Sequence, residues 1–438
     1  MGTRTVRLSA AFALALAIAP AVAQQQKYDL LLKGGHVIDP KNQLSAVRDV
    51  AIAGGKVALV ASNIAAADAS KVVDVSGLYV TPGLVDIHVH VFAGTGERGS
   101  YAGDNSVYPD GFTLRAGVTT VVDAGSSGWR SFEDFKDRVI DRSKTRVLAL
   151  LNIVGAGMRG ARFENDLADM EAKPTADMAL RHKGIVVGIK TAHYAGPEWT
   201  PVERAVEAGT IANVPVMVDF GTNHAERPLA DLVTKKLRPG DIYTHMYSGL
   251  RNELVDGHVN PGMREGRQRG VIFDVGHGGG SFVWRIAAPA IKEGFVPDSI
   301  STDLHIGSMN AGMKDMLNVM DKFLAMGQSL DQVVRWSTWN PAREIRREEL
   351  GHLSVGAPAD VAVLSVEKGR FGFVDIYGAR LAGTQKLVCE LTLRDGKVVY
   401  DLNGLTRQDW TTLPRDYRQT GDAKWDALTP APVRRDPR

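Results

Sequence analysis

The sequence predicts an α/β fold in which a TIM-like (β/α)8 barrel is joined to a small β-sandwich domain. Three observations lead to this prediction: eight apolar runs of strand length in the middle of the chain, helix-like stretches between them, and β-rich segments at both ends. Eight alternations of strand and helix are typical of a closed parallel barrel. Periodicity does not show closure, so a doubly wound open sheet stays an alternative.

Residues 1–23 are expected to be a signal peptide. They combine a basic start, a short apolar run and the sequence Ala21-Val22-Ala23, which suits cleavage by a signal peptidase. The run is too short for a spanning helix flanked by stop-transfer charges, so we expect no stable membrane anchor, with a retained anchor as the alternative. Export to the periplasm or the medium follows. Cys389 is the only cysteine, which excludes an intramolecular disulfide.

The two β-rich ends, residues 27–80 and 349–402, consist of short strand-like pieces separated by turn signals such as Asp395-Gly396. Neither end has enough strands for a sandwich of its own. We therefore expect them to pair into one β-sandwich domain, with the metal-dependent hydrolase barrel formed by residues 81–348 between them. Residues 403–438 are polar and rich in proline and arginine near the end, which predicts a poorly packed tail.

The eight central runs are almost continuously apolar, as expected for parallel strands that are covered on both faces. In chain order they are VDIHVH, GVTTVVDAG, RVLALLNIV, IVVGIK, VPVMVDF, DIYTHMY, GVIFDVGHG and SISTDLH. Reactive side chains of parallel barrels lie at the carboxyl ends of the strands. The polar residues that end these runs are therefore the candidates for chemistry.

Composition and motifs exclude several classes of partner. The 52 basic and 50 acidic residues leave a formal charge of +2, too little to predict a nucleic-acid or anionic membrane surface, so a small molecule is the expected partner. A G-x-G-x-x-G string occupies residues 155–160, but the next run ends in Lys190 and not in the acidic residue that would hold a ribose. No P-loop and no G-x-S-x-G nucleophile motif occurs in the sequence.

Four of the runs carry, at or near their ends, five side chains that suit a metal site. His88 and His90 are two positions apart on the first strand, so both rings face the same side and can reach one metal. The fourth run ends in Lys190, and burial there would make its amine neutral and reactive. The sixth run contains His245 and the eighth contains Asp303. Each residue alone has an ordinary structural explanation. Their coincidence at strand ends that open onto one cavity favours a metal centre.

These segments resemble the amidohydrolase superfamily and, within it, the dihydroorotase-like deacetylases. The motifs that carry the resemblance are PGLVDIHVH after the β-rich start, GIKTAH, STDLHIGSMN, and GHLSVGAPAD before the β-rich end, and they span nearly the whole chain after residue 23. The resemblance implies two divalent metal ions, usually zinc, bridged by a carbamate that carbon dioxide forms on Lys190. It also implies that His88, His90 and Asp303 bind the more buried ion.

The fifth run departs from this family. It ends in Asp219, where the family usually has a histidine ligand of the second metal. Because a carboxylate oxygen also binds zinc, we interpret Asp219 as the replacement, with His245 as its partner. Two alternatives stay open: His224 on the following loop could take the position, or the second ion could be weak or absent.

The resemblance implies hydrolysis of an amide or acyl bond of a small molecule, such as an N-acyl compound, by a hydroxide that bridges the metals. Asp303 would act as the general base and then the general acid. His277 is a candidate for contact with the substrate or its developing oxyanion, or else a supporting residue in a turn. His193 and Tyr194 follow Lys190 closely and are candidate pocket residues, to which we assign no role.

Two other functions compete with this interpretation. A cyclic amidase of the dihydroorotase or hydantoinase type would share every metal residue and differ in its loops. A barrel-shaped binding protein without catalysis would explain the unusual Asp219, although it need not retain the other metal residues. Association into a homo-oligomer is an expectation by analogy with the family.

Overall fold

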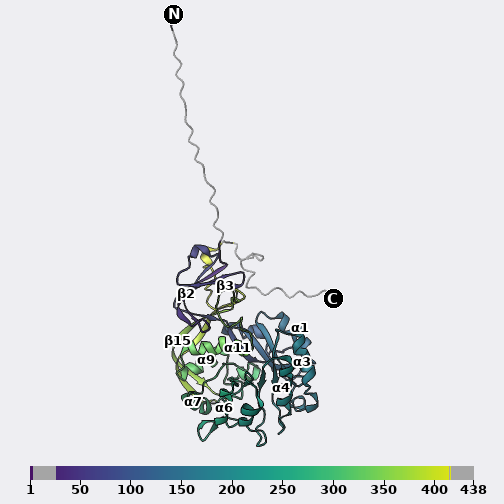
Figure 1. Cartoon of the computed structure of the whole chain (residues 1–438). Coiled ribbons are helices and arrows are strands. Elements are labelled where there is room, and N and C mark those ends of the chain that lie inside the picture. The colour runs from purple at the N-terminus through teal and green to yellow at the C-terminus, as the bar shows by residue number, and fades with distance from the viewer. Residues whose placement is uncertain (3–25, 414, 416–438) are drawn as a thin grey trace.

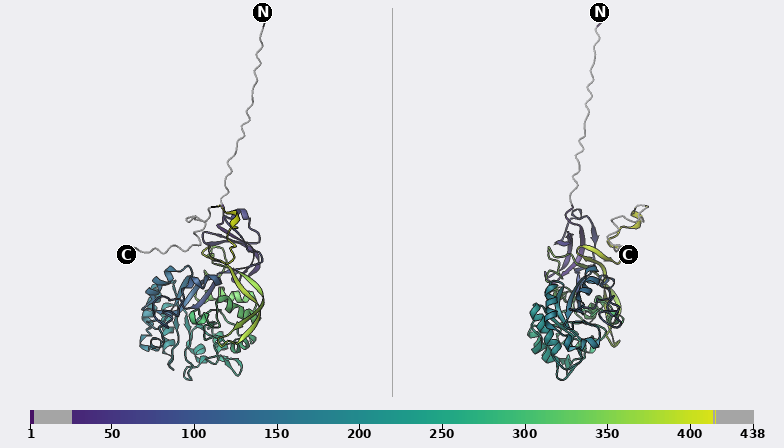
Figure 2. Two further views of the ribbon diagram at one scale, coloured as in Figure 1. Left: turned by 180° about the vertical axis from the view of Figure 1, so that it is seen from behind. Right: turned by 90° about the vertical axis from the view of Figure 1, so that its right-hand side faces the viewer.

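The computed structural model describes residues 1–2, 26–413 and 415 (Figure 1). The predicted signal peptide, apart from its first two residues, and most of the predicted tail lie outside this part of the chain. The described residues form a barrel with a smaller β-rich part above it, a division that is also visible from behind and from the side in Figure 2. None of the helices within this part is both long and apolar enough to cross a membrane.

A parallel sheet of seven strands forms the inner wall of the barrel, in the order β14-β11-β10-β9-β8-β7-β6. The strands are β6 (Leu84–Val89), β7 (Val118–Gly128), β8 (Arg146–Asn152), β9 (Val186–Thr191), β10 (Val216–Val218), β11 (Ile242–Tyr243) and β14 (Ile272–Phe273). Each overlaps one of the first seven apolar runs, which confirms the predicted fold class. Nearly all of their residues are buried, as expected where side chains fill the barrel and helices cover it.

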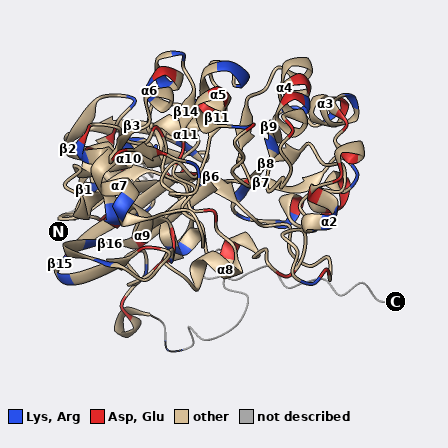
Figure 3. Ribbon diagram, turned by 90° about the horizontal axis from the view of Figure 1, so that it is seen from below, with Lys and Arg blue, Asp and Glu red and all other residues tan. Residues whose placement is uncertain are grey.

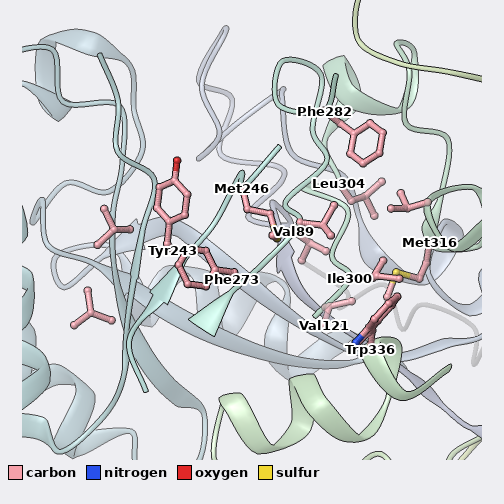
Figure 4. Packing of buried hydrophobic residues seen from close by; sticks show 14 of the residues in the cluster. Val89, Val121, Tyr243, Met246, Phe273, Phe282, Ile300, Leu304, Met316 and Trp336 are labelled. Carbon is pink, nitrogen blue, oxygen red and sulfur yellow. The ribbon is translucent and has the colours of Figure 1, made fainter. Parts of the chain in front are cut away.

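The eighth run forms no regular strand, but its backbone closes the barrel. The Val275 amide donates to the Ser299 carbonyl at 3.1 Å on one side, and the His90 amide donates to the Leu304 carbonyl at 2.8 Å on the other. Residues 299–304 therefore lie between β14 and β6. Asp303 has φ +50°, a left-handed conformation that departs from strand geometry. Val89 and Leu304, from the two sides of this seam, pack in the same apolar core (Figure 4).

Helices cover the outside of the barrel, and both signs of charge occur along α3 and α4 (Figure 3). The α-helices are α1 (Phe132–Arg138), α2 (Ala161–Glu164), α3 (Ala172–Arg181), α4 (Thr200–Ala212), α5 (Leu229–Asp231), α6 (Pro261–Gln268), α7 (Trp284–Lys292), α8 (Ile306–Met309), α9 (Met316–Ala325), α10 (Leu330–Ser337) and α11 (Trp339–Glu344). Asp315 starts α9 by accepting the Asn318 amide at 2.8 Å. A short hairpin, β12 (Leu254–Val255) and β13 (His258–Val259), precedes α6.

Strands from both ends of the chain form one mixed sheet in the order β17-β16-β15-β5-β1-β2-β3, with β4 beside β1. Their bounds are β1 (Leu30–Asp39), β2 (Leu44–Ala53), β3 (Lys56–Ala61), β4 (Val72–Asp74), β5 (Tyr79–Pro82), β15 (Val361–Val374), β16 (Arg380–Arg394) and β17 (Lys397–Asp401). The predicted pairing of the two ends is confirmed. The strands make one continuous sheet, because β5 pairs with β1 on one edge and with β15 on the other.

The β15–β16 hairpin reaches beyond this sheet and packs against the barrel. Phe373 and Leu387, from its far part, are buried in the same apolar cluster as the barrel strands. The Leu387 amide donates to Asp321 Oδ1 of α9 at 2.8 Å. At the near end, Arg146 of β8 forms an ion pair with Asp360, just before β15. The hairpin thus holds the barrel and the terminal strands together.

Candidate metal centre

Three predicted ligands form a compact group at the carboxyl ends of the barrel strands. The ligand atoms of His88, His90 and Asp303 all lie within 4.8 Å of one another, and the three side chains are buried. Asp303 Oδ1 lies 3.1 Å from His90 Nε2 and 3.7 Å from His88 Nε2. Two imidazole nitrogens and a carboxylate oxygen are a donor set that zinc and related divalent ions accept. The group is therefore a metal-binding group.

Hydrogen bonds fix both imidazole rings with Nε2 directed at this group. His88 Nδ1 lies 3.0 Å from Thr244 Oγ1, whose hydroxyl donates to Asp274 at 2.7 Å, so the ring nitrogen must be the donor to the threonine. His90 Nδ1 lies 2.9 Å from Ser126 Oγ. Burial and the nearby Lys190 hold the pKa of His88 well below its usual value, which favours the neutral, metal-binding imidazole.

Lys190, the last residue but one of β9, lies beside this group. Its Nζ lies 3.0 Å from His88 Nε2, and the side chain is 1% exposed. Burial lowers the pKa of Lys190 and outweighs the attraction of Asp219 and Asp303. The stem of the lysine requires a glycine on β7, because a Cβ at Gly125 would lie 2.8 Å from Lys190 Cβ. The chain thus places a buried amine in direct contact with a metal-binding histidine.

A second set of polar side chains gathers around Asp219, just after β10. Asp219 Oδ2 lies 3.3 Å from His245 Nε2 and 3.2 Å from His193 Nε2, while Oδ1 accepts from Arg251 Nη2 at 2.8 Å. Burial alone would raise the pKa of Asp219, but the two histidines outweigh it and hold this pKa well below its usual value. His193 also contacts Glu164, and the two carboxylates raise its pKa to about 10 against the effect of burial.

The two sets share a cavity of about 610 Å³, a size that suits a small molecule. The Tyr101 ring packs against His90 and His305, with centroid distances of 4.5 and 5.0 Å, and covers the centre from the loop after β6. The lining residues are Tyr101, His193, Asp219, Gly221, Thr222, Asn223, His245, Leu250, Arg251, Gly279, Gly280, Ser281, Asp303 and His305.

Two candidate histidines do not reach this cavity. His277 is fully buried, its Nδ1 donates to the Gly278 carbonyl at 2.9 Å, and its Nε2 lies 2.5 Å from Lys322 Nζ. The supporting role that the sequence left open for His277 matches this position, and contact with a substrate does not. His224 Nε2 lies 2.7 Å from the Ala195 carbonyl, and the residue is not part of the cavity wall.

Several residues of the site received no role from the sequence, notably His193, Glu164 and Arg251. The one signal for His193 was its position three residues after Lys190. Backbone strain also marks the site: His193, His245 and Asp303 have φ values of +57°, +65° and +50°. Such conformations are unfavourable for residues other than glycine and concentrate at functional sites.

A parallel β/α barrel with a buried His–His–Asp group at the carboxyl ends of its strands belongs among the metal-binding barrel proteins. The family model described as "Amidohydrolase family" matches residues 284–399. The Agrobacterium fabrum protein named deacetylase Atu3266 is 34% identical over 328 residues, which cover 73% of this chain and 78% of that protein. The chain belongs to the amidohydrolase superfamily.

Other known proteins are similar over most of their length. A protein from Enterococcus faecalis named deacetylase is 28% identical over 383 residues, covering 85% of this chain and 99% of that protein. Crystal structures of an adenine deaminase and a dihydroorotase superpose with TM-scores of 0.77 and 0.72. Both are 28% identical and cover 85% of this chain, and 100% and 99% of their own chains are matched.

Proposed function

We propose that the protein is a metal-dependent deacetylase or related amidohydrolase that hydrolyses an amide or acyl bond of a small N-acyl or O-acyl compound. The observation that carries the proposal is the buried group of His88, His90 and Asp303, which lies beside Lys190 and a cavity of about 610 Å³. The names of the curated relatives from Agrobacterium fabrum and Enterococcus faecalis support deacetylation as the reaction.

We propose that two zinc ions bind here and that Lys190, carrying a carbamate, would be a ligand of both. The donor set fits, because Lys190 contacts the His88 imidazole and is attracted by the carboxylates of Asp219 and Asp303. The neutral amine would add to carbon dioxide and release one proton, which turns the lysine into a carboxylate ligand. Bound divalent ions would polarise the scissile carbonyl and lower the pKa of water.

The protein's own residues would supply the proton transfer. Asp303 Oδ1 contacts both histidines, while the Asp303 side chain also lines the cavity where a substrate would lie. We propose that Asp303 takes a proton from the attacking water and delivers it to the leaving nitrogen or oxygen. Tyr101 and His305, which pack together over the centre, would limit access of bulk water during this transfer.

A cyclic amidase is the second candidate, and the similarity to a dihydroorotase of known structure favours it specifically. Ring-opening and deacetylation need the same metal centre, so the two functions differ in the shape of the cavity wall. The inactive binding protein is the third candidate, and it predicts neither bound metal nor turnover sensitive to chelators.

The test is metal content per chain of the purified protein, measured by elemental analysis together with activity on N-acetyl amino acids, O-acetyl compounds, hydantoin and dihydroorotate. We expect close to two ions and hydrolysis of at least one acetylated compound, lost after chelation and regained with zinc. Hydrolysis confined to the cyclic compounds would favour the cyclic amidase. A protein without metal or turnover on the whole panel would contradict the proposal.

We further propose that the protein is exported and that a signal peptidase cleaves it after Ala23, because residues 1–23 have the sequence of a signal peptide. N-terminal sequencing of the protein from cell fractions tests this, with Gln24 expected as the first residue of the exported form. A homo-oligomer is proposed by family analogy alone, and light scattering on the same sample would detect it.

A further inference from the structure

We propose that His193 is a ligand of the second metal ion, together with Asp219 and His245, and that Glu164 orients its ring. The inference rests on the proposed function, because it concerns the metal centre of the same site. It also answers the departure at β10, where Asp219 stands in place of the histidine that the family resemblance leads us to expect.

Three adjacent strands bring the proposed ligands together. His193, Asp219 and His245 follow β9, β10 and β11, which are neighbours in the parallel sheet. The Nε2 atoms of the two histidines lie 3.2 and 3.3 Å from the same oxygen, Asp219 Oδ2. Two nitrogen donors therefore flank one oxygen donor at the wall of the cavity, in a wider group than that of His88, His90 and Asp303.

The opposite nitrogen of each ring is held by an acceptor from elsewhere in the barrel. His193 Nδ1 lies 2.6 Å from Glu164 Oε2, and His245 Nδ1 lies 2.5 Å from the Gly276 carbonyl. Metal-binding histidines usually donate their other N–H to a carboxylate or a backbone carbonyl. His88 and His90 are held through Nδ1 in the same way, by Thr244 and Ser126. His193 therefore has the orientation of the other metal-facing histidines.

Glu164 is buried and held in position for its contact with His193. The residue is 2% exposed although it lies on the four-residue helix α2, and its second oxygen accepts the Gly160 amide at 2.9 Å. A buried carboxylate is costly unless it is paired, and among the described residues His193 is its ion-pair partner. A histidine that served only packing would not require a buried acid behind it.

Arg251 sets which oxygen of Asp219 is available. Its Nη2 lies 2.8 Å from Oδ1, and the Gly221 amide donates to the same oxygen at 3.2 Å. Oδ2 is thus the oxygen that both histidines face. Asp219 could then contribute one oxygen to the ion while Arg251 balances the negative charge that the aspartate adds.

The experiment compares metal content in the full-length wild type, His193→Ala, Glu164→Gln and a control, His258→Ala. His258 also lies 2.9 Å from a carboxylate, Glu293, but on the surface and outside the cavity. Each protein is loaded with zinc, freed of excess metal and assayed by elemental analysis, with circular dichroism to check the fold. We expect about two ions in the wild type and the control, and about one in His193→Ala.

Glu164→Gln keeps the shape of the side chain, so it tests the inference even if His193→Ala fails to fold. A chelator titration should show the weaker ion leaving at roughly 10- to 100-fold lower chelator concentration than in the wild type. Two ions retained by His193→Ala, or an unchanged titration of Glu164→Gln, would overturn the inference and leave the proposed function intact. One ion in the wild type would also overturn it, whereas none would contradict the proposed function itself.

Discussion

Asp303 lies where the two tasks proposed for it, metal binding and proton transfer, meet. Its Oδ1 faces both histidines of the metal-binding group, and its left-handed backbone conformation aims the carboxylate into the barrel mouth. The neighbouring strand end must approach closely, since a Cβ at Gly278 would lie 2.3 Å from Asp303 Oδ2. Burial raises the pKa of Asp303, but His88, His90 and His305 outweigh this effect and lower it, so the side chain is a carboxylate.

If this carboxylate transfers the proton, Asp303→Asn should lower kcat by roughly 10²- to 10⁴-fold, the usual contribution of a general base. Asparagine keeps an oxygen in the same place, so the His88 and His90 ion should remain bound. Steady-state kinetics and elemental analysis of the variant check both statements. An unchanged kcat with metal bound would show that another group moves the proton.

The sequence could predict residues of the site where a strand rule applies, and not elsewhere. His88 and Asp303 end apolar runs, and such positions lie at the barrel mouth whatever the loops do. The same rule placed His277 correctly at a strand end but could not give the direction of its ring, which turns toward Lys322. His193 and Glu164 lie outside the strands, and no periodicity encodes where a loop brings its side chains.

At the scale of elements, the apolar runs predicted strand positions but not their regularity or length. The run SISTDLH closes the barrel without forming a strand: its carbonyls accept bonds from the segment after β14 up to Thr302 and from His90 at Leu304, and Asp303 between them has a left-handed conformation. The opposite holds for β15 and β16, whose 14 and 15 residues extend far past the terminal sheet. Their extra length is explained by packing on α9, a tertiary contact that local patterns do not reveal.

The contact between α9 and β16 should make stability depend on pH. Asp321 Oδ1 accepts the Leu387 amide, and burial raises the pKa of Asp321 to about 8. The unfolded chain releases this proton near pH 4, whereas the folded chain retains it up to about pH 8. The folded state binds more protons in this window, so this group's contribution to the free energy of unfolding falls as pH rises.

Asp321→Asn should remove this dependence, because the amide oxygen still accepts from Leu387 and the side chain does not ionise. At pH 8 we expect the variant to exceed the wild type by about 1 kcal/mol or more, with a smaller difference at pH 5. Urea unfolding between pH 5 and pH 9 measures it, with the exposed residue in Asp137→Asn as the control. Parallel curves for the variant and the wild type would contradict the assignment.

At the scale of the whole molecule, strands that precede and follow the barrel in sequence form one sheet, which lies beside the barrel (Figure 2). This arrangement could be predicted, because neither β-rich end suffices alone and β5 must find a partner in β15. The contacts that hold the barrel and the terminal sheet together could not be predicted from the sequence. The Arg146–Asp360 ion pair joins segments 214 residues apart in the chain, and Phe373 is buried in the apolar cluster of the barrel; such contacts leave no local signal.

The barrel is closed at one seam, and the proposed metal lies across it. His88 belongs to β6 and His90 follows it directly, while Asp303 belongs to the closing segment whose Leu304 carbonyl accepts the His90 amide. An ion bound by all three would hold the first and eighth positions of the barrel together. Because a ligand stabilises the state that binds it, free metal at 100 times its Kd should add about 2.7 kcal/mol to the free energy of unfolding.

Removal of metal by a chelator should therefore lower Tm, and zinc should restore it. Hydrogen exchange should locate the loss: the amides of His90 and Gly278, which bond to the closing segment, should exchange faster, while Val50 in the terminal sheet should not. A matched sample with zinc added back controls for effects of the chelator itself. If the metal-free protein keeps its Tm and its exchange pattern, hydrogen bonds and packing alone close the seam, and the ion serves chemistry without holding the barrel shut.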